Sequence, residues 1–383
     1  MHFTNRSAFF FDMTGKEIIK YIENWAPGEI AWQKDNVGLQ VGSGERKIRN
    51  ILLSLDLTDN VVDDAIKKDC NFIITHHPFL FHPLRKLDLQ KDKNSRIIEK
   101  LIKHDLTLYS AHTNLDSVKG GVSFQLAKKL ELNDINFLAP LKSNQFKLIV
   151  FVPEDFTEIV SEAIYKAGGG IIGEYSNCSF RTKGKGTFKG SSKSKPTIGV
   201  RGTYEKVEEV KLEVVVDSWK ISAIISAMTK VHPYEKVAYD IIPLANINEN
   251  YGMGAQGYLS KPMNEREFLA FTAQKLRIKN FRYVKGRKKI ISKVAVCGGS
   301  GSEYIEDALH NNADAFITAD LKYHTFQDYQ DEILLIDAGH FETEIFSLDE
   351  VKNRLSNYIG STKSKVKVFK YAGSTNPIIF YNN

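Results

Sequence analysis

Short apolar runs alternate with amphipathic segments along this chain, and this alternation limits the possible folds more than any other feature. In the first third, apolar runs at 48–57, 71–77 and 106–112 are separated by segments 58–69 and 95–105, whose apolar spacing is that of helices. Strands and helices that alternate at this spacing predict a parallel sheet with helices on its faces.

The last third of the chain repeats the rhythm. Strands are expected at 293–302, 313–320 and 332–340, with a helix at 302–312. The predicted fold class is therefore α/β, with two similar lobes, one at 1–140 and the other at 250–383.

The middle of the chain has a different pattern. Strands are expected at 146–155, 211–218 and 237–244, helices at 156–170 and 219–233, and a loop rich in Gly, Lys and Ser between the first helix and the second strand. Two strand–helix–strand units in succession predict a ferredoxin-like α+β domain, inserted between the lobes at 145–247.

Several general features restrict the class of protein. No apolar stretch approaches the ~20 residues of a membrane span. The three cysteines form no CxxC pair, which favours a reducing cytoplasm. Thr14 and Glu17 form a capping-box pattern that starts the first helix, so residues 1–12 are interpreted as a dispensable extension.

The net charge of +6 is mild, and much of the excess lies in segments 181–195 and 277–293, neither of which contains an acidic residue. A solvated loop and a solvated hairpin explain them, and binding to nucleic acid or phosphate is the alternative.

Potential metal ligands follow three of the predicted strands. In a parallel sheet, ligands bind beyond the carboxyl ends of the strands. Imidazole and carboxylate together suit divalent zinc, iron, manganese or nickel. Two adjacent histidines at a strand end can serve two ions about 3.5–4 Å apart, and a carboxylate can bridge such a pair. The residues in question are His76 and His77, then His112 and Asp116, then His340 and Glu344.

Each motif alone also has an ordinary explanation. Adjacent histidines often occur in a loop by chance, and the spacing of His340 and Glu344 is common for surface pairs on helices. His324 and His112 are candidates for proton transfer or for support of the ligands, or they are structural histidines. The turn Gly298, Gly299, Ser300, Gly301 is either a binding site for a substrate phosphate or carboxylate, or a tight structural turn.

Six stretches together resemble the GTP cyclohydrolase I type 2 homologs, also called the Nif-three-like proteins. The resemblance covers about 14–140 and 250–383, and the insert resembles the PII/CutA-like domain of the longer members, most clearly in "HPYEKVAYDIIP". Lys34, Ser123 and Ala319 depart from the usual pattern, but none is an expected ligand. The six stretches, in order, are "DNVGLQVG", "ITHHP", "AHTNLDSVKGG", "VCGGSG", "ADAFITADLKYH" and "DAGHFETE".

The resemblance implies two α/β lobes around a dinuclear metal centre and a homohexameric toroid with its sites facing an internal cavity. By motif, His76 and Asp116 would bind one ion, His77 and His340 the other, and Glu344 would be shared. Zinc is the expected metal, with iron, manganese or nickel as alternatives.

Two functions remain open at this point. One is a metal-dependent hydrolase that opens the imidazole ring of GTP and releases formate, as the family name implies. The other is a non-catalytic metal-binding or regulatory protein whose insert senses a small ligand. In either case the expected partners are other copies of the chain and a small molecule or nucleotide, with nucleic acid as an open alternative and no membrane.

Overall fold

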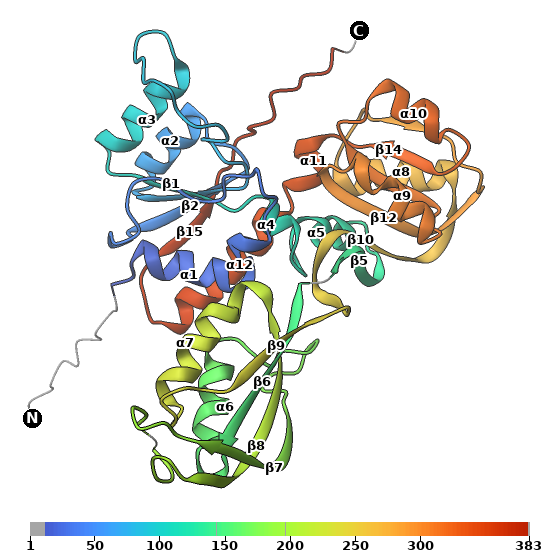
Figure 1. Cartoon of the computed structure of the whole chain (residues 1–383). Helices are drawn as coiled ribbons and strands as arrows, with labels where there is room; N and C mark the ends of the chain where they lie inside the picture. Colours follow the sequence, from blue (N-terminus) through green and yellow to red (C-terminus); the bar gives the residue numbers. More distant parts are fainter. Residues whose placement is uncertain (1–11, 143, 196, 382–383) are drawn as a thin grey trace, which may run out of the picture. The chain divides into compact units, whose positions relative to one another are not determined.

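The computed structural model describes residues 12–142, 144–195 and 197–381. The chain divides into two compact units, one made of residues 1–139 and 251–383 and the other of residues 140–250. The larger unit has two sheets and the smaller unit has one (Figure 1). Each unit has its own buried core. Within the described residues, no helix is long and apolar enough to cross a membrane.

The first sheet of the larger unit has five strands in the order β1-β4-β3-β2-β15. The edge strand β1 runs antiparallel to β4, whereas β4, β3, β2 and β15 are mutually parallel. Their bounds are β1 Gly38–Val41, β2 Asn50–Ser54, β3 Phe72–Thr75, β4 Thr107–Ser110 and β15 Lys367–Lys370.

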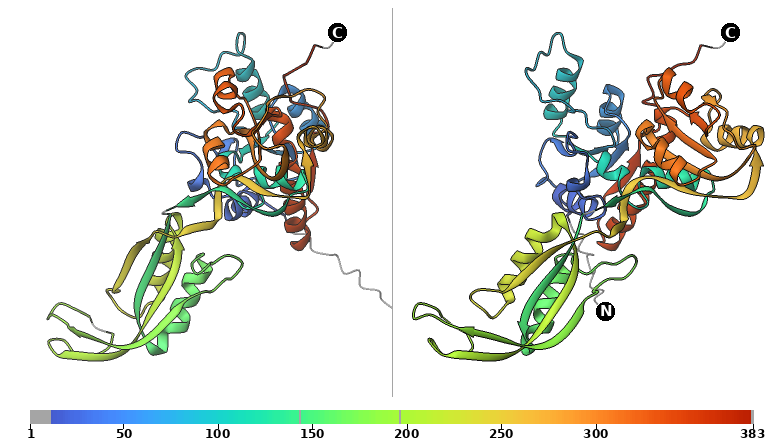
Figure 2. Two further views of the ribbon diagram at one scale, coloured as in Figure 1. Left: turned by 90° about the vertical axis from the view of Figure 1, so that its right-hand side faces the viewer. Right: turned by 45° about the vertical axis from the view of Figure 1, so that its right-hand side comes forward.

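Helices cover both faces of this sheet (Figures 1 and 2). Apolar side chains of α2 and α3 form one core with alternate residues of β2, β3 and β4. The predicted cap of α1 is present, since the Thr14 N–H donates to the Glu17 carboxylate at 2.7 Å. The helices are α1 Gly15–Trp25, α2 Asp59–Lys67, α3 Lys93–Lys103 and α12 Ser347–Ser361.

The second sheet has six strands in the order β11-β14-β13-β12-β10-β5. Strands β14, β13 and β12 are parallel, while β11 and β10 are antiparallel to their neighbours. An antiparallel edge strand followed by parallel strands is thus common to both sheets. The bounds are β5 Asn133–Lys142, β10 Ile247–Asn264, β11 Arg282–Val284, β12 Ile290–Ser300, β13 Ala315–Ala319 and β14 Leu334–Asp337.

Both faces of this second sheet are buried, as the apolar runs of its parallel strands require. Val294 and Val296 face the core formed with α5 and α8, whereas Ala295 and Cys297 face the core formed with α9 and α10. These helices are α5 Val122–Lys129, α8 Glu265–Leu276, α9 Ile305–His310 and α10 Tyr323–Tyr329. The predicted α/β class is confirmed by this arrangement.

The smaller unit has one antiparallel sheet in the order β7-β8-β6-β9 with two helices on one face (Figure 2). The element order β-α-β-β-α-β is that of a ferredoxin-like unit. The elements are β6 Gln145–Pro153, α6 Thr157–Lys166, β7 Phe180–Lys189, β8 Tyr204–Asp217, α7 Ile221–Val231 and β9 Tyr239–Leu244.

Two predictions about local structure were wrong, and a third lies almost entirely outside the described residues. Residues 181–189 belong to strand β7, so the prediction of a loop there was wrong. The basic segment 277–293 is not a hairpin, because β11 pairs with β14 rather than with the following residues. The extension predicted at residues 1–12 lies, apart from Asp12, outside the described residues.

Candidate metal centre

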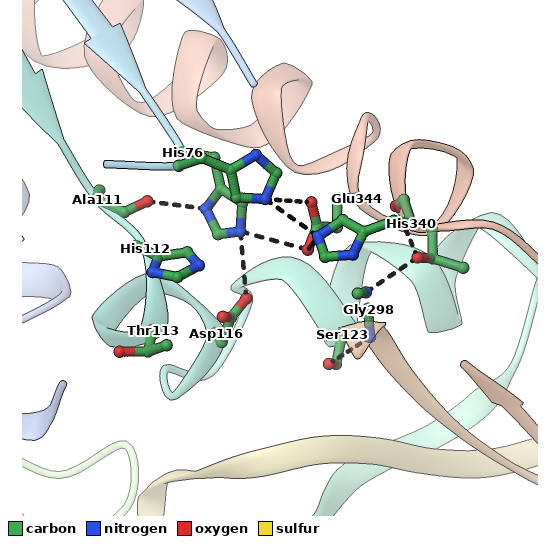
Figure 3. A network of polar contacts seen from close by, with 12 residues as sticks. His76, Ala111, His112, Thr113, Asp116, Ser123, Gly298, His340 and Glu344 are labelled. Atoms are coloured by element: carbon green, nitrogen blue, oxygen red, sulfur yellow. Dashed lines mark hydrogen bonds and ion pairs between the residues drawn. The ribbon is translucent and has the colours of Figure 1, made fainter. Parts of the chain in front are cut away.

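The predicted ligands lie at the carboxyl ends of parallel strands from both sheets of the larger unit (Figure 3). His76 and His77 directly follow β3. A short helix α4, Thr113–Asp116, follows β4, with His112 at its N-cap and Asp116 as its last residue. Another short helix, α11, His340–Glu344, follows β14 and begins and ends with the other two ligands.

The turn after β3 brings the two adjacent imidazoles to the same region. The backbone N–H groups of His76 and His77 still donate to the carbonyls of Ser54 and Leu55, which extends the pairing with β2. The Thr75 hydroxyl donates to the His77 carbonyl at 2.9 Å, which fixes the turn locally. As a result the two ring centroids are only 5.0 Å apart, although adjacent side chains of a regular strand point to opposite faces.

Three of the predicted ligands, His76, His77 and His340, converge on the carboxylate of Glu344, and Asp116 adjoins His76. His77 Nε2 lies 3.0 Å from Glu344 Oε2, and His340 Nε2 lies 3.1 Å from Oε1. His76 Nε2 lies 3.6 Å from Glu344 Oε1 and also 3.6 Å from Asp116 Oδ1. The side chain of Glu344 is only 3% exposed, so this carboxylate depends on its neighbours for solvation.

All four imidazoles of the region are oriented in the same way. In each ring Nδ1 faces an oxygen that can only accept, so Nδ1 carries a proton and Nε2 faces the centre, where its lone pair can bind a metal ion once the ring is neutral. This is how metal-binding histidines are held in proteins. The acceptors are the Ala111 carbonyl for His76 at 2.8 Å, Asp56 for His77 at 2.8 Å, Asp35 for His112 at 2.9 Å and Asp320 for His340 at 2.6 Å.

Buried polar atoms without a hydrogen-bond partner show that the centre fits a metal ion. Among the described residues these atoms include His76 Nε2, Asp116 Oδ1 and Glu344 Oε2. In addition, the Nε2 atoms of His77 and His340 lie 3.1 Å apart, where two lone pairs repel unless a proton or a cation lies near them. Within the described residues, two groups have ligand atoms close enough to hold a metal: His76, His77 and His112, and His77, His340 and Glu344.

The electrostatics of the metal-free centre are dominated by these contacts. Burial lowers the pKa of His77, but its contacts with the carboxylates of Asp56 and Glu344 outweigh it and raise the pKa to about 10. His340 behaves in the same way, with contacts to Glu344 and Asp320 that raise its pKa to about 9. Burial raises the pKa of Asp116, whereas the surrounding imidazoles hold the pKa of Glu344 well below its usual range despite its burial.

The two histidines predicted to transfer protons have different environments. His112 lies at the centre, with its ring centroid 5.2 Å from that of His76 and 5.5 Å from that of His77. Asp35 holds it and also accepts from the Thr113 hydroxyl, and these bonds lower the pKa of Asp35 despite its burial. His324 is exposed on α10 and contacts Gln327 and Tyr323. Because these contacts do not reach the centre, the role predicted for His324 stays a prediction.

The glycine turn Gly298–Gly301 packs against the carboxylate of Glu344 and is not an open loop. Gly299 has φ +64°, and a β-carbon there would lie 2.3 Å from Glu344 Oε1, so only glycine leaves space for the carboxylate. The N–H of Gly299 donates to Thr343 at 3.0 Å, and the N–H of Gly298 donates to Ser123 at 3.2 Å. These two N–H groups are engaged within the protein, and the substrate-binding role of the turn stays a prediction.

Three residues that support His77 and His340 were missed by the sequence analysis. Asp56 follows β2 and Asp320 follows β13, so the rule that placed the ligands at strand ends could also have found these carboxylates. Thr375 donates to Asp56 Oδ2 at 2.7 Å from the segment after β15. Because it is 319 residues away in the chain, no local pattern indicates this contact.

Comparison with known proteins identifies the family. The family model described as Duf34/NIF3 (NGG1p interacting factor 3) matches residues 13–377. The chain belongs to the Duf34/NIF3 family. The resemblance to the GTP cyclohydrolase I type 2 homologs is thereby confirmed, since proteins named "GTP cyclohydrolase 1 type 2 homolog" share its sequence. The one from Halalkalibacterium halodurans is 40% identical over 96% of this chain and 98% of its own length, and the one from Bacillus subtilis is 39% identical over 96% and 99%.

Solved structures of NIF3 relatives share the fold over nearly the whole chain. A Bacillus cereus protein related to NIF3 superposes with a TM-score of 0.85 and 37% identity, covering 97% of this chain and all of the other. Staphylococcus aureus protein SA1388 gives a TM-score of 0.76 and 28% identity, covering 97% and 99%. These two solved structures thus match the residues of the smaller unit as well as those of the larger one.

Proposed function

We propose that this NIF3-family protein is a metal-dependent hydrolase with two divalent ions held by His76, His77, Asp116, His340 and Glu344. The observation that carries the proposal is the convergence of imidazole Nε2 atoms on buried carboxylate oxygens that lack hydrogen-bond partners. His76 and Asp116 would hold one ion, His77 and His340 the other, and Glu344 would be shared. Zinc suits this ligand set, as do iron, manganese and nickel.

The chemistry follows from the arrangement of the residues. Bound divalent ions would supply Lewis acidity and lower the pKa of water near neutrality. His112, held through Nδ1 by Asp35, presents Nε2 toward the centre and would accept or return a proton there. The names of the relatives support GTP as the substrate, with two water molecules adding in turn at C8 of the guanine imidazole ring, its bonds to N7 and N9 breaking, and that carbon leaving as formate.

Formate release tests the proposal directly. Protein loaded separately with zinc, iron or manganese would be incubated with GTP, and formate would be measured together with the loss of guanine absorbance. We expect turnover by at least one metal form, and a loss of more than about a hundredfold in His77→Ala and Glu344→Gln. Turnover that persists in both variants would place the reaction elsewhere.

The second candidate is a non-catalytic metal-binding protein whose insert, proposed to be PII/CutA-like, senses a small ligand within a homohexamer. A ligand-sized cavity in the smaller unit favours this candidate. It predicts that no metal form releases formate from GTP, and that size-exclusion chromatography with light scattering gives about six times the mass of one chain.

A further inference from the structure

The smaller unit contains a cavity of about 740 Å³ that is separate from the metal centre. It lies against the face of the sheet opposite α6 and α7, because Glu209 and Lys211 line it while the alternate residues Val210 and Leu212 are buried on the helix side. The volume falls in the range of cavities that hold small organic ligands.

Glycines in β7 leave room for this cavity. Gly184 pairs with Glu209, and a β-carbon at Gly184 would meet no atom within 4 Å. At Gly186, in contrast, a β-carbon would collide with the carboxylate of Glu209. The wall is thus open at Gly184, where any larger side chain would extend into the empty space.

Six lysines and only two glutamates line the cavity, so it favours an anion. Three of the lysines are paired with carboxylates: Lys183 with Glu154, Lys185 with Glu208, and Lys211 with Glu213. The other three, Lys189, Lys195 and Lys236, have no carboxylate partner among the described residues. Three ammonium groups without an ion pair, against two lining carboxylates, favour a ligand with several negative charges.

The two lining glutamates are already engaged. Glu209 accepts from the Tyr234 hydroxyl at 2.7 Å, and Glu235 accepts from the Lys195 backbone N–H at 3.0 Å. Neither forms an ion pair with the three free lysine side chains in the described structure, although both carboxylates keep their negative charge.

Aromatic rings form another part of the lining. Phe188 and Tyr234 lie edge to face, with centroids 6.1 Å apart, and Phe151 also lines the cavity. Aromatic side chains next to a basic wall suit a ligand that combines a planar ring with phosphates, because rings stack on aromatic faces while ammonium groups bind phosphate oxygens. We propose that this cavity binds a nucleoside polyphosphate, with its phosphates at Lys189, Lys195 and Lys236 and its base against Phe188 and Tyr234.

This proposal does not rest on the activity of the metal centre, and its test separates the two sites. Isothermal titration calorimetry would measure GTP and ATP binding to the full-length protein carrying Glu344→Gln, in which the metal centre is impaired. Guanosine and inorganic triphosphate would be titrated as probes of the two halves of the ligand. We expect at least one nucleotide to bind at least tenfold more tightly than either half.

Two variants target the cavity, and a third is a matched control. The double variant Lys189→Ala with Lys236→Ala removes two free charges, and Gly184→Leu fills the open wall. Each should raise the Kd of the nucleotide at least tenfold. Lys230→Ala removes an exposed lysine of α7 that does not line the cavity, so it should change the Kd by less than about twofold. Circular dichroism would check that each variant is folded. If Gly184→Leu is unfolded, the lysine double variant alone decides the test.

Three results would overturn the proposal. The first is that neither nucleotide binds, or that the cavity variants bind as tightly as their parent. The second is that inorganic triphosphate binds as tightly as the nucleotides, since the aromatic rings would then play no part. The third is that a single-stranded oligonucleotide binds far more tightly than any mononucleotide and loses affinity in the lysine variant, which would make this surface a nucleic-acid interface.

Discussion

Glu344 is the residue on which the metal centre depends, because its two oxygens face the Nε2 atoms of three histidines. We expect Glu344→Gln, which keeps the shape but removes the charge, to reduce the metal content of purified protein by at least one ion per chain, measured by plasma mass spectrometry. Glu342→Gln is the matched control, since Glu342 lies on the same helix and bonds Asn376 rather than an imidazole. Equal metal content in both variants would contradict this assignment.

The protonation of His77 and His340 gives a second prediction at the scale of the residue. Their pKa values of about 10 and about 9 lie above the ordinary value, so the two facing Nε2 atoms hold an additional proton at pH 7.5 when no metal is bound. A divalent ion needs the neutral ring, so binding must release protons and affinity must rise with pH up to these pKa values. Calorimetry in buffers of different ionisation enthalpy would count the protons. An affinity that does not change between pH 6 and 8 would show that these rings are not ligands.

Among the elements, the end of β12 restricts the centre most tightly. We expect Gly299→Ala to destabilise the protein by about 1–3 kcal/mol and to lower its metal content, because alanine disfavours the positive φ and its β-carbon would displace Glu344. Gly360→Ala in α12 is the matched control, since a β-carbon there meets no atom within 4 Å. It should instead raise stability by about 0.5–1 kcal/mol. Urea unfolding measures both, and equal effects would refute the steric argument.

The elements also show what the sequence could reveal. The parallel strands and the histidines that follow them could be predicted, because buried parallel strands are continuous apolar runs and their ends share one edge. Strand β7 could not, since its Gly and Lys residues resemble a loop and its pairing with β8 decides its conformation. Likewise, β15 joins the first sheet and β5 the second through contacts distant in the chain. Local periodicity carries no information about such pairings.

At the scale of the molecule, the centre links two sheets that have separate cores. His76 and His77 follow the first sheet, whereas His340 and Glu344 follow the second, so shared ions would join the two within the larger unit. The strands of the smaller unit contribute none of the predicted ligands. Metal ions that bind only the folded state would therefore stabilise the larger unit, which supplies all the predicted ligands.

Metal removal should therefore affect the two units differently. We expect chelation to lower the Tm of the transition that reports the larger unit by about 5–10 °C, as loss of a ligand present at about a hundred times its Kd would do. Hydrogen exchange would locate the change, with faster exchange in β3 and β14 and unchanged rates in β6 and β8, whose core is formed within the smaller unit. Restoring the metal should restore protection. An equal loss of protection in all four strands would mean that the ions also stabilise the smaller unit. No loss of protection in any of them would mean that the five side chains meet without binding a metal.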